Sequence, residues 1–107
     1  MSRPPPELIQ FFRPVFEHFL PRAEMLARGH PEAELTSWWR DRIDNRRVGG
    51  NPDSQHLFGF AFDLVVNDPE QTAEDARRLG FVAVVESDHV HLQFFPAGTL
   101  RRHGFFG

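Results

Sequence analysis

Two short segments of the chain alternate strictly between apolar and other side chains, and this alternation limits the fold more than any other feature of the sequence. In residues 60–66 it places large apolar side chains on one face of an extended chain and Asp63 on the other. In residues 89–95 it places His89 and His91 together, opposite the apolar side chains. A period of two residues predicts a β-strand in each segment, with one face against a hydrophobic core.

The segment between these strands carries the start and stop signals of a helix. Asp68 is a suitable N-cap, Pro69 fits the first helical position, and Gln71 completes a capping-box pattern. Gly80 is a typical stop signal just past a helix. We therefore expect a helix over residues 69–79.

The first third of the chain is predicted to be helical. Apolar residues recur at helical spacing from Leu8 to Phe19, which predicts one amphipathic helix or two short ones divided at Pro14. A further short helix is expected within residues 22–33, closed by Gly29. The apolar face of an ordinary surface helix packs on the core of its own domain, so we favour this arrangement over a membrane or partner helix.

The remaining segments complete a prediction of the fold class. Residues 34–38 are expected to be extended, and residues 41–48 to form a charged helix or turn. A third strand is expected over residues 81–85, joined by a short turn to the strand over 89–95. We therefore predict an α+β fold in which a small antiparallel sheet, with the strand over 60–66 as its third member, is flanked by helices.

A chain of 107 residues is long enough for one hydrophobic core, so we expect a single domain with a single site. Its expected parts are a helical segment over residues 1–33, a core over residues 34–95 and an irregular tail over residues 96–107. The net charge of −3 is spread over mixed signs, which gives no support for nucleic-acid binding. No apolar run is long enough for a membrane span.

The chain contains no cysteine, so any zinc site must be built from histidines and carboxylates. His56 and Asp63 lie seven residues apart, across a turn and the start of a strand. A third ligand would come from another strand, where His91 is the natural candidate. Three such ligands and one open position for water are typical of a hydrolytic zinc site.

Four segments of the chain carry a pattern found in a known family. They are Thr36-Ser37-Trp38-Trp39-Arg40, Asn45-Arg46-Arg47-Val48-Gly49-Gly50, Ser54-Gln55-His56-Leu57-Phe58-Gly59-Phe60-Ala61-Phe62-Asp63 and His89-Val90-His91. In this order they resemble the zinc D-Ala-D-Ala carboxypeptidases and L-alanyl-D-glutamate endopeptidases that cut peptidoglycan. The stretch from Glu86 to His91 is also similar to one in hedgehog signalling domains, which share the metal geometry, so the expected fold is hedgehog/DD-peptidase-like.

The resemblance implies the roles of the site residues. It implies that Zn²⁺ is held by His56, Asp63 and His91, the second histidine of the His-x-His pair. It also implies that Glu86, just before the ligand strand, is the general base. Asp88 in the same turn is the alternative base.

Three further residues are candidates for catalysis or substrate binding. His89 shares a face with His91, from which it could donate a hydrogen bond to a developing oxyanion. By the resemblance, Arg40 would clamp a carboxylate or carbonyl of the substrate, with an ion pair to Asp44 as the alternative. Ser54 is expected to add a hydrogen bond to the substrate.

The chain departs from the family pattern at three bulky positions. Trp38 stands where the family usually has glycine, and Phe60 and Phe62 replace smaller or more polar residues. We therefore expect a narrower or more apolar groove. In the central motif, we expect Gly59 and Ala61 to leave room on the metal face.

Two classes of function follow from the resemblance. The first is a zinc peptidase acting on peptidoglycan peptides, and the alternative is a non-catalytic, metal-containing binding or structural module. Such a module could meet an assembly partner through the N-terminal segment or the tail. The N-terminus has no signal-peptide pattern, so we expect the protein to stay in the cytoplasm until it is released or delivered to the cell wall, for example by a phage virion.

Overall fold

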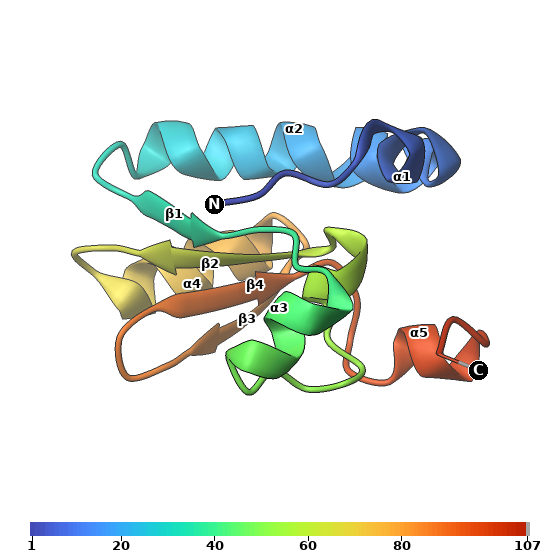
Figure 1. Ribbon diagram of the computed structural model, residues 1–107. Helices are drawn as coiled ribbons and strands as arrows, with labels where there is room; N and C mark the ends of the chain where they lie inside the picture. The colour runs from blue at the N-terminus through green and yellow to red at the C-terminus, as the bar shows by residue number, and fades with distance from the viewer. Residues whose placement is uncertain (107) are drawn as a thin grey trace.

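The structure is a computed structural model that describes residues 1–106. It confirms the α+β class: four strands form one antiparallel sheet in the order β1-β2-β4-β3 (Figure 1). The strands are β1 (Glu34–Ser37), β2 (Ala61–Val65), β3 (Val82–Val85) and β4 (Val90–Gln93). The three predicted strands are therefore confirmed within two residues at each end, and the predicted extended segment adds β1 as an edge strand.

The two strands with alternating residues lie side by side in the middle of the sheet. In the register of β2 and β4, Asp63 is the direct cross-strand partner of His91. Because successive side chains point to opposite faces, Phe62 and Leu92 are buried on the core face while Asp63 and His91 share the other face. The pairing of β2 with β4 thus brings two predicted metal ligands together.

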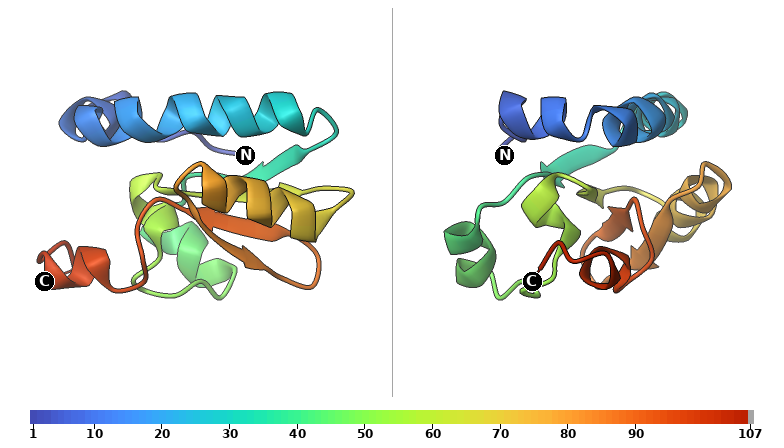
Figure 2. Two further views of the ribbon diagram at one scale, coloured as in Figure 1. Left: turned by 180° about the vertical axis from the view of Figure 1, so that it is seen from behind. Right: turned by 90° about the vertical axis from the view of Figure 1, so that its right-hand side faces the viewer.

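Two helices cover the core face of the sheet. These are α2 (Arg13–Gly29) and α4 (Pro69–Arg78), which lie together on one side in both views of Figure 2. The predicted N-cap and stop of α4 are confirmed, because Asp68 accepts a hydrogen bond from the backbone of Gln71, and Gly80 has a left-handed φ of 95°. The predicted capping box is not formed, because the Gln71 amide donates to Asp75 instead. The short α1 (Pro6–Phe11), α3 (Arg42–Arg47), the 3-10 helix η1 (Gln55–Phe58) and α5 (Thr99–Arg102) complete the fold.

The prediction for the N-terminal third was partly wrong. The break falls at Phe12, so that Pro14 lies in the first turn of α2, where its missing N–H costs nothing. In contrast, the short helix expected within residues 22–33 is the second half of α2, which continues through Pro21. Pro21 has no N–H to donate to the carbonyl of Glu17, four residues earlier, and the Arg22 side chain donates to the neighbouring carbonyl of His18.

Phenylalanine rings from α2 and from the strands fill the core. Phe19 of α2 stacks on Phe94 with 4.3 Å between ring centroids, and Phe94 in turn stacks on Phe60 at 5.4 Å. The apolar face of α2 is therefore buried in the core of its own chain, as we expected in preference to a partner helix. No helix among residues 1–106 has the length and apolar character required for a membrane span.

The tail was expected to be irregular, but it contains the one-turn helix α5. Leu100 anchors this helix because its side chain is only 6% exposed within the core. Arg101, the next residue, forms an ion pair with Asp53 in the loop before η1. Short-range periodicity cannot reveal a helix of four residues that is held by contacts far away in the sequence.

His30 lies where α2 ends and is largely buried. Its side chain is 12% exposed and joins the end of α2 to α4, where Nε2 lies 2.8 Å from an Asp75 carboxylate oxygen. Its Nδ1 lies 3.3 Å from the hydroxyl oxygen of Thr72. The ring thus has hydrogen-bonding partners on both sides and holds the two core-covering helices together.

Candidate metal centre

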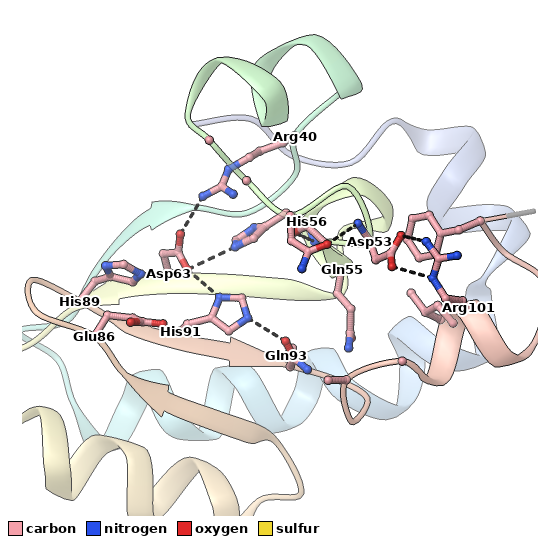
Figure 3. Close-up of a pocket in the computed structure, with 18 residues that line it drawn as sticks. Arg40, Asp53, Gln55, His56, Asp63, Glu86, His89, His91, Gln93 and Arg101 are labelled. Carbon is pink, nitrogen blue, oxygen red and sulfur yellow. Dashed lines mark hydrogen bonds and ion pairs between the residues drawn. The ribbon is translucent and has the colours of Figure 1, made fainter.

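The three predicted metal ligands converge at one point of the sheet face (Figure 3). Asp63 Oδ1 lies 3.2 Å from His56 Nε2 and 3.0 Å from His91 Nδ1. One ligand atom from each residue lies within 4.8 Å of the others. Two ligands of a tetrahedral zinc ion, each bound at about 2.0–2.1 Å, are about 3.3 Å apart, so these contacts have the spacing of a metal site.

Each histidine is held from behind by an oxygen. His56 Nδ1 lies 2.5 Å from the backbone carbonyl of Trp38, and His91 Nε2 lies 2.9 Å from the side-chain oxygen of Gln93. A neutral imidazole has a single N–H, and these acceptors place it on the nitrogen that faces away from Asp63. The lone pair of each ring then points toward the ligand position, as in histidines that bind metals.

This arrangement has more acceptors than donors, and a cation resolves the imbalance. With the far nitrogens protonated, two imidazole lone pairs and a carboxylate oxygen face one another without a proton between them. A cation among them would be bound by all three atoms at once. The residues of this chain therefore fit a divalent metal held by two nitrogens and one oxygen.

The electrostatics of Asp63 favour positive charge at the same point. In the absence of a metal, burial alone would raise the pKa of the Asp63 carboxyl, but when His56 and His91 also carry a proton on the nitrogen facing Asp63, their hydrogen bonds and charges lower that pKa well below its ordinary value. Burial likewise lowers the pKa of His91, but its bonds to Asp63 and Gln93 outweigh that effect and raise it. The carboxylate thus stays ionised and stabilises a cation beside it.

The 3-10 helix η1 positions His56. The hydroxyl of Ser54 caps its start by accepting from the backbone N–H of His56, and Gly59 ends it in the left-handed conformation, with φ of 75°. A side chain at Gly59 would also collide with Pro4. Our prediction that Gly59 leaves room on the metal face was wrong, because Gly59 instead makes room for the N-terminal segment behind the motif.

Arg40 is bound to the second oxygen of Asp63, with Nη2 2.9 Å from Oδ2. The alternative partner, Asp44, instead lies 3.4 Å from Arg47. The Arg40 backbone N–H also donates to the carbonyl of His56. Arg40 therefore fixes the orientation of the carboxylate, so that Oδ1 is left to face the two imidazoles.

The turn after β3 holds the candidates for acid–base chemistry. Glu86 and His89 line the same groove as the ligands, and both are labelled beside Asp63 and His91 in Figure 3. His89 Nε2 lies 3.6 Å from Asp63 Oδ1, and its Nδ1 lies 2.7 Å from an Asp88 oxygen. Asp88 has an 84% exposed side chain and is not among the groove-lining residues of the described chain.

All seven predicted site residues line one open groove of about 500 Å³. They are Arg40, Ser54, His56, Asp63, Glu86, His89 and His91. The prediction of a narrower, more apolar groove was wrong: Trp38, Phe60 and Phe62 are buried in the core and line no part of it. Trp38 is held there by its indole N–H, which donates to the carbonyl of Gly59.

Gln93 lies on β4 two residues after His91, on the ligand face, and no function was predicted for it. Its amide oxygen faces His91, while its amide nitrogen donates to the Phe95 carbonyl at 2.8 Å. The second bond fixes which end of the amide faces the histidine. The signal in the sequence was the spacing of two residues along a strand, which puts Gln93 beside His91.

Replacing Gln93 with leucine is expected to weaken metal binding by about 10–100-fold, because the residue that orients a ligand histidine typically contributes that much. Competition with a chelating dye, followed in the full chain, would measure the metal dissociation constant. Gln71 is a suitable control, since it is an exposed glutamine on α4 whose amide donates to Asp75. Equal metal affinity in Gln93→Leu and Gln71→Leu would contradict the orienting function.

The comparisons with known proteins agree with this geometry. A family model described as Peptidase M15 matches residues 26–93, which include every ligand and both residues that hold the ligand histidines from behind. No curated protein and no solved structure matches the chain significantly.

Proposed function

Because the chain belongs to the peptidase M15 family, we propose that it is a zinc-dependent peptidase that cleaves the peptides of bacterial peptidoglycan. The observation that carries the proposal is the convergence of His56, Asp63 and His91 at the wall of an open groove that Glu86 also lines. An open side next to three ligands is what a hydrolytic metal site requires.

The residues of the chain divide the chemistry between them. When bound, zinc polarises the scissile carbonyl and lowers the pKa of a coordinated water to about 7. Glu86 accepts the proton from the attacking water, which is the task of a general base in this groove. His89 donates a hydrogen bond to the oxygen on which negative charge develops. Arg40 keeps the Asp63 carboxylate aligned toward the ligand histidines.

Two observations support Glu86 over Asp88 as the base. Glu86 lines the groove, and its carboxylate has no hydrogen bond or ion pair to any other residue in the described range 1–106, so it is free to accept a proton. Asp88 is engaged by His89 and turned to solvent. The contact instead suits Asp88 to orienting the His89 ring.

Arg40 is proposed to act mainly by positioning Asp63, although it was first expected to clamp the substrate. One of its terminal nitrogens is committed to Asp63 Oδ2, and its side chain is only 19% exposed. The guanidinium has further N–H donors, so a substrate carbonyl can still reach it along the groove that it lines.

Digestion of purified peptidoglycan by the zinc-loaded chain tests the proposal. Mass assignment of the released fragments would distinguish loss of a terminal D-alanine from cleavage between L-alanine and D-glutamate. Metal analysis of the same sample should give one zinc per chain. A chain that holds zinc and binds the wall peptides but releases no fragments would support the alternative, a non-catalytic metal-containing module.

A further inference from the structure

A second groove of about 300 Å³ adjoins the metal groove, and the two share part of their walls. The shared lining residues are Gly50, Asp53, Arg101 and Phe106. The second groove runs between α3, the loop before η1 and the C-terminal segment that contains α5. A ligand in the metal groove can therefore extend into it.

The walls of this second groove are strongly basic. Arg42 and Arg46 come from α3 and Arg101 from α5, against a single acidic residue, Asp53, among the lining residues of the described chain. Three guanidinium groups opposite one carboxylate leave an excess of two positive charges. The protein as a whole carries a net charge of −3, so this excess is a local feature. We call this surface, defined by Arg42, Arg46 and Arg101, the arginine groove.

The ion pair in the arginine groove indicates which anion fits there. Arg101 donates two hydrogen bonds to the Asp53 carboxylate, from Nε to Oδ2 at 2.7 Å and from Nη2 to Oδ1 at 2.5 Å. This forked contact is the geometry with which arginine recognises carboxylates. The pair is accessible, since the side chains of Arg101 and Asp53 are 60% and 33% exposed.

We propose that the arginine groove is a subsite that binds a second carboxylate of the peptide substrate, at a distance from the scissile bond. The proposal rests on the proposed function only in taking the ligand to be a peptidoglycan stem peptide, which carries carboxylates on its glutamate and at its C-terminus. Arg101 lies beyond residues 26–93 that match the family, so the C-terminal segment of this chain supplies one of the three arginines of the subsite.

Binding of acidic and amidated stem peptides tests the proposal. The probes are a stem tetrapeptide and two forms of it, one amidated at the glutamate α-carboxyl and one at the C-terminus. Calorimetry on the zinc-loaded Glu86→Gln chain gives dissociation constants without relying on turnover. Charged contacts that are open to solvent contribute little, so the effect should be modest. The tetrapeptide with both carboxylates free, the acid form, is expected to bind about three- to tenfold more tightly than one of the two amides. Salt should reduce this difference.

Substitutions with matched controls test whether the tighter binding of the acid form depends on the arginine groove. Arg101→Gln and Arg46→Gln should remove most of the preference for the acid form. Arg102→Gln and Arg47→Gln make the same change of charge on the same two helices, but neither residue lines the arginine groove, so they should keep the preference. A preference that is absent in the starting chain, or that survives Arg101→Gln unchanged, would overturn the proposal.

The Asp53→Asn variant shows whether Arg101 binds the ligand or whether its ion pair with Asp53 only holds the structure together. If Asp53 competes with the ligand for Arg101, its loss should tighten binding of the acid form by a few-fold, opposite in direction to Arg101→Gln. If the pair only tethers α5, both substitutions should weaken binding equally, which would contradict the subsite. If the wild-type chain hydrolyses no peptidoglycan but still binds the acid form more tightly than the amides, the result would contradict the peptidase proposal and still support the carboxylate subsite.

Discussion

Replacing Asp63 with alanine is expected to remove both the bound metal and the peptidase activity. Asp63 supplies the one anionic ligand, and its second oxygen is held by Arg40. Its removal leaves two histidines and an unpaired, largely buried guanidinium around the metal position. The loss of metal affinity should exceed the about 10–100-fold expected for a residue that only supports a ligand. Metal content after dialysis and the rate of peptidoglycan digestion would measure both effects.

Two further variants make this result interpretable. Asp63→Asn keeps the size of the side chain but removes its charge, so it should lose metal while disturbing the fold less than alanine does. His103→Ala serves as the control, because His103 is exposed and is not among the groove-lining residues of the described chain. A folded Asp63→Asn chain that retains stoichiometric zinc would show that the site assignment is wrong.

Glu86→Gln is expected to retain zinc and to lower turnover by about 10²–10⁴-fold, the usual effect of removing a general base. Glutamine preserves the shape of the side chain but cannot accept the proton of the attacking water. The measurement is kcat on a soluble stem peptide, with metal content determined on the same preparation. Retained zinc separates this variant from those of the ligands.

Asp88→Asn is the matched control for Glu86→Gln. Asp88 lies in the same turn but is bonded to His89 and exposed, so its substitution should lower turnover less. If Glu86→Gln cleaves normally while Asp88→Asn is inactive, the two functions must be exchanged. If the wild-type chain is inactive on every peptidoglycan preparation, the non-catalytic alternative replaces the peptidase.

Sequence patterns predicted the two strands that carry Asp63 and His91 but not the 3-10 helix of His56, and the reason for the success is local. The alternation around Asp63 and His91 fixes which side chains share a face once the strands pair. The capping residues of α4 likewise act within a few residues of their own helix. Where structure depends on neighbours in the chain, a single sequence was therefore sufficient.

The predictions that failed depend on contacts between distant segments. A separate helix was expected within residues 22–33, but α2 continues through Pro21 because the helix packs on the core, which offsets the one lost backbone bond. Gly59 was expected to leave room on the metal face, but the residue that excludes a side chain there is Pro4, 55 residues earlier in the chain. No periodicity in the sequence indicates which distant segment packs against a given glycine.

Arg40 shows the same limit within the site itself. Its presence near the metal was predicted from the resemblance, but its partner was not, because Asp44 and Asp63 are both carboxylates that an arginine could reach. The deciding factor is the position of β2 beside β1, which brings Asp63 opposite Ser37, three residues before Arg40. Strand pairing of this kind is a property of the folded chain.

The order of the strands has a consequence for how the molecule opens. All three metal donors come from η1, β2 and β4, and the two strands among them occupy the centre of the sheet. A metal that binds only when these elements are folded together should therefore slow the hydrogen exchange of backbone amides most strongly in β2 and β4. The edge strands β1 and β3 contribute no donor and can still fray at their outer sides. With metal bound, the two central strands of the sheet would therefore be more rigid than the two edge strands.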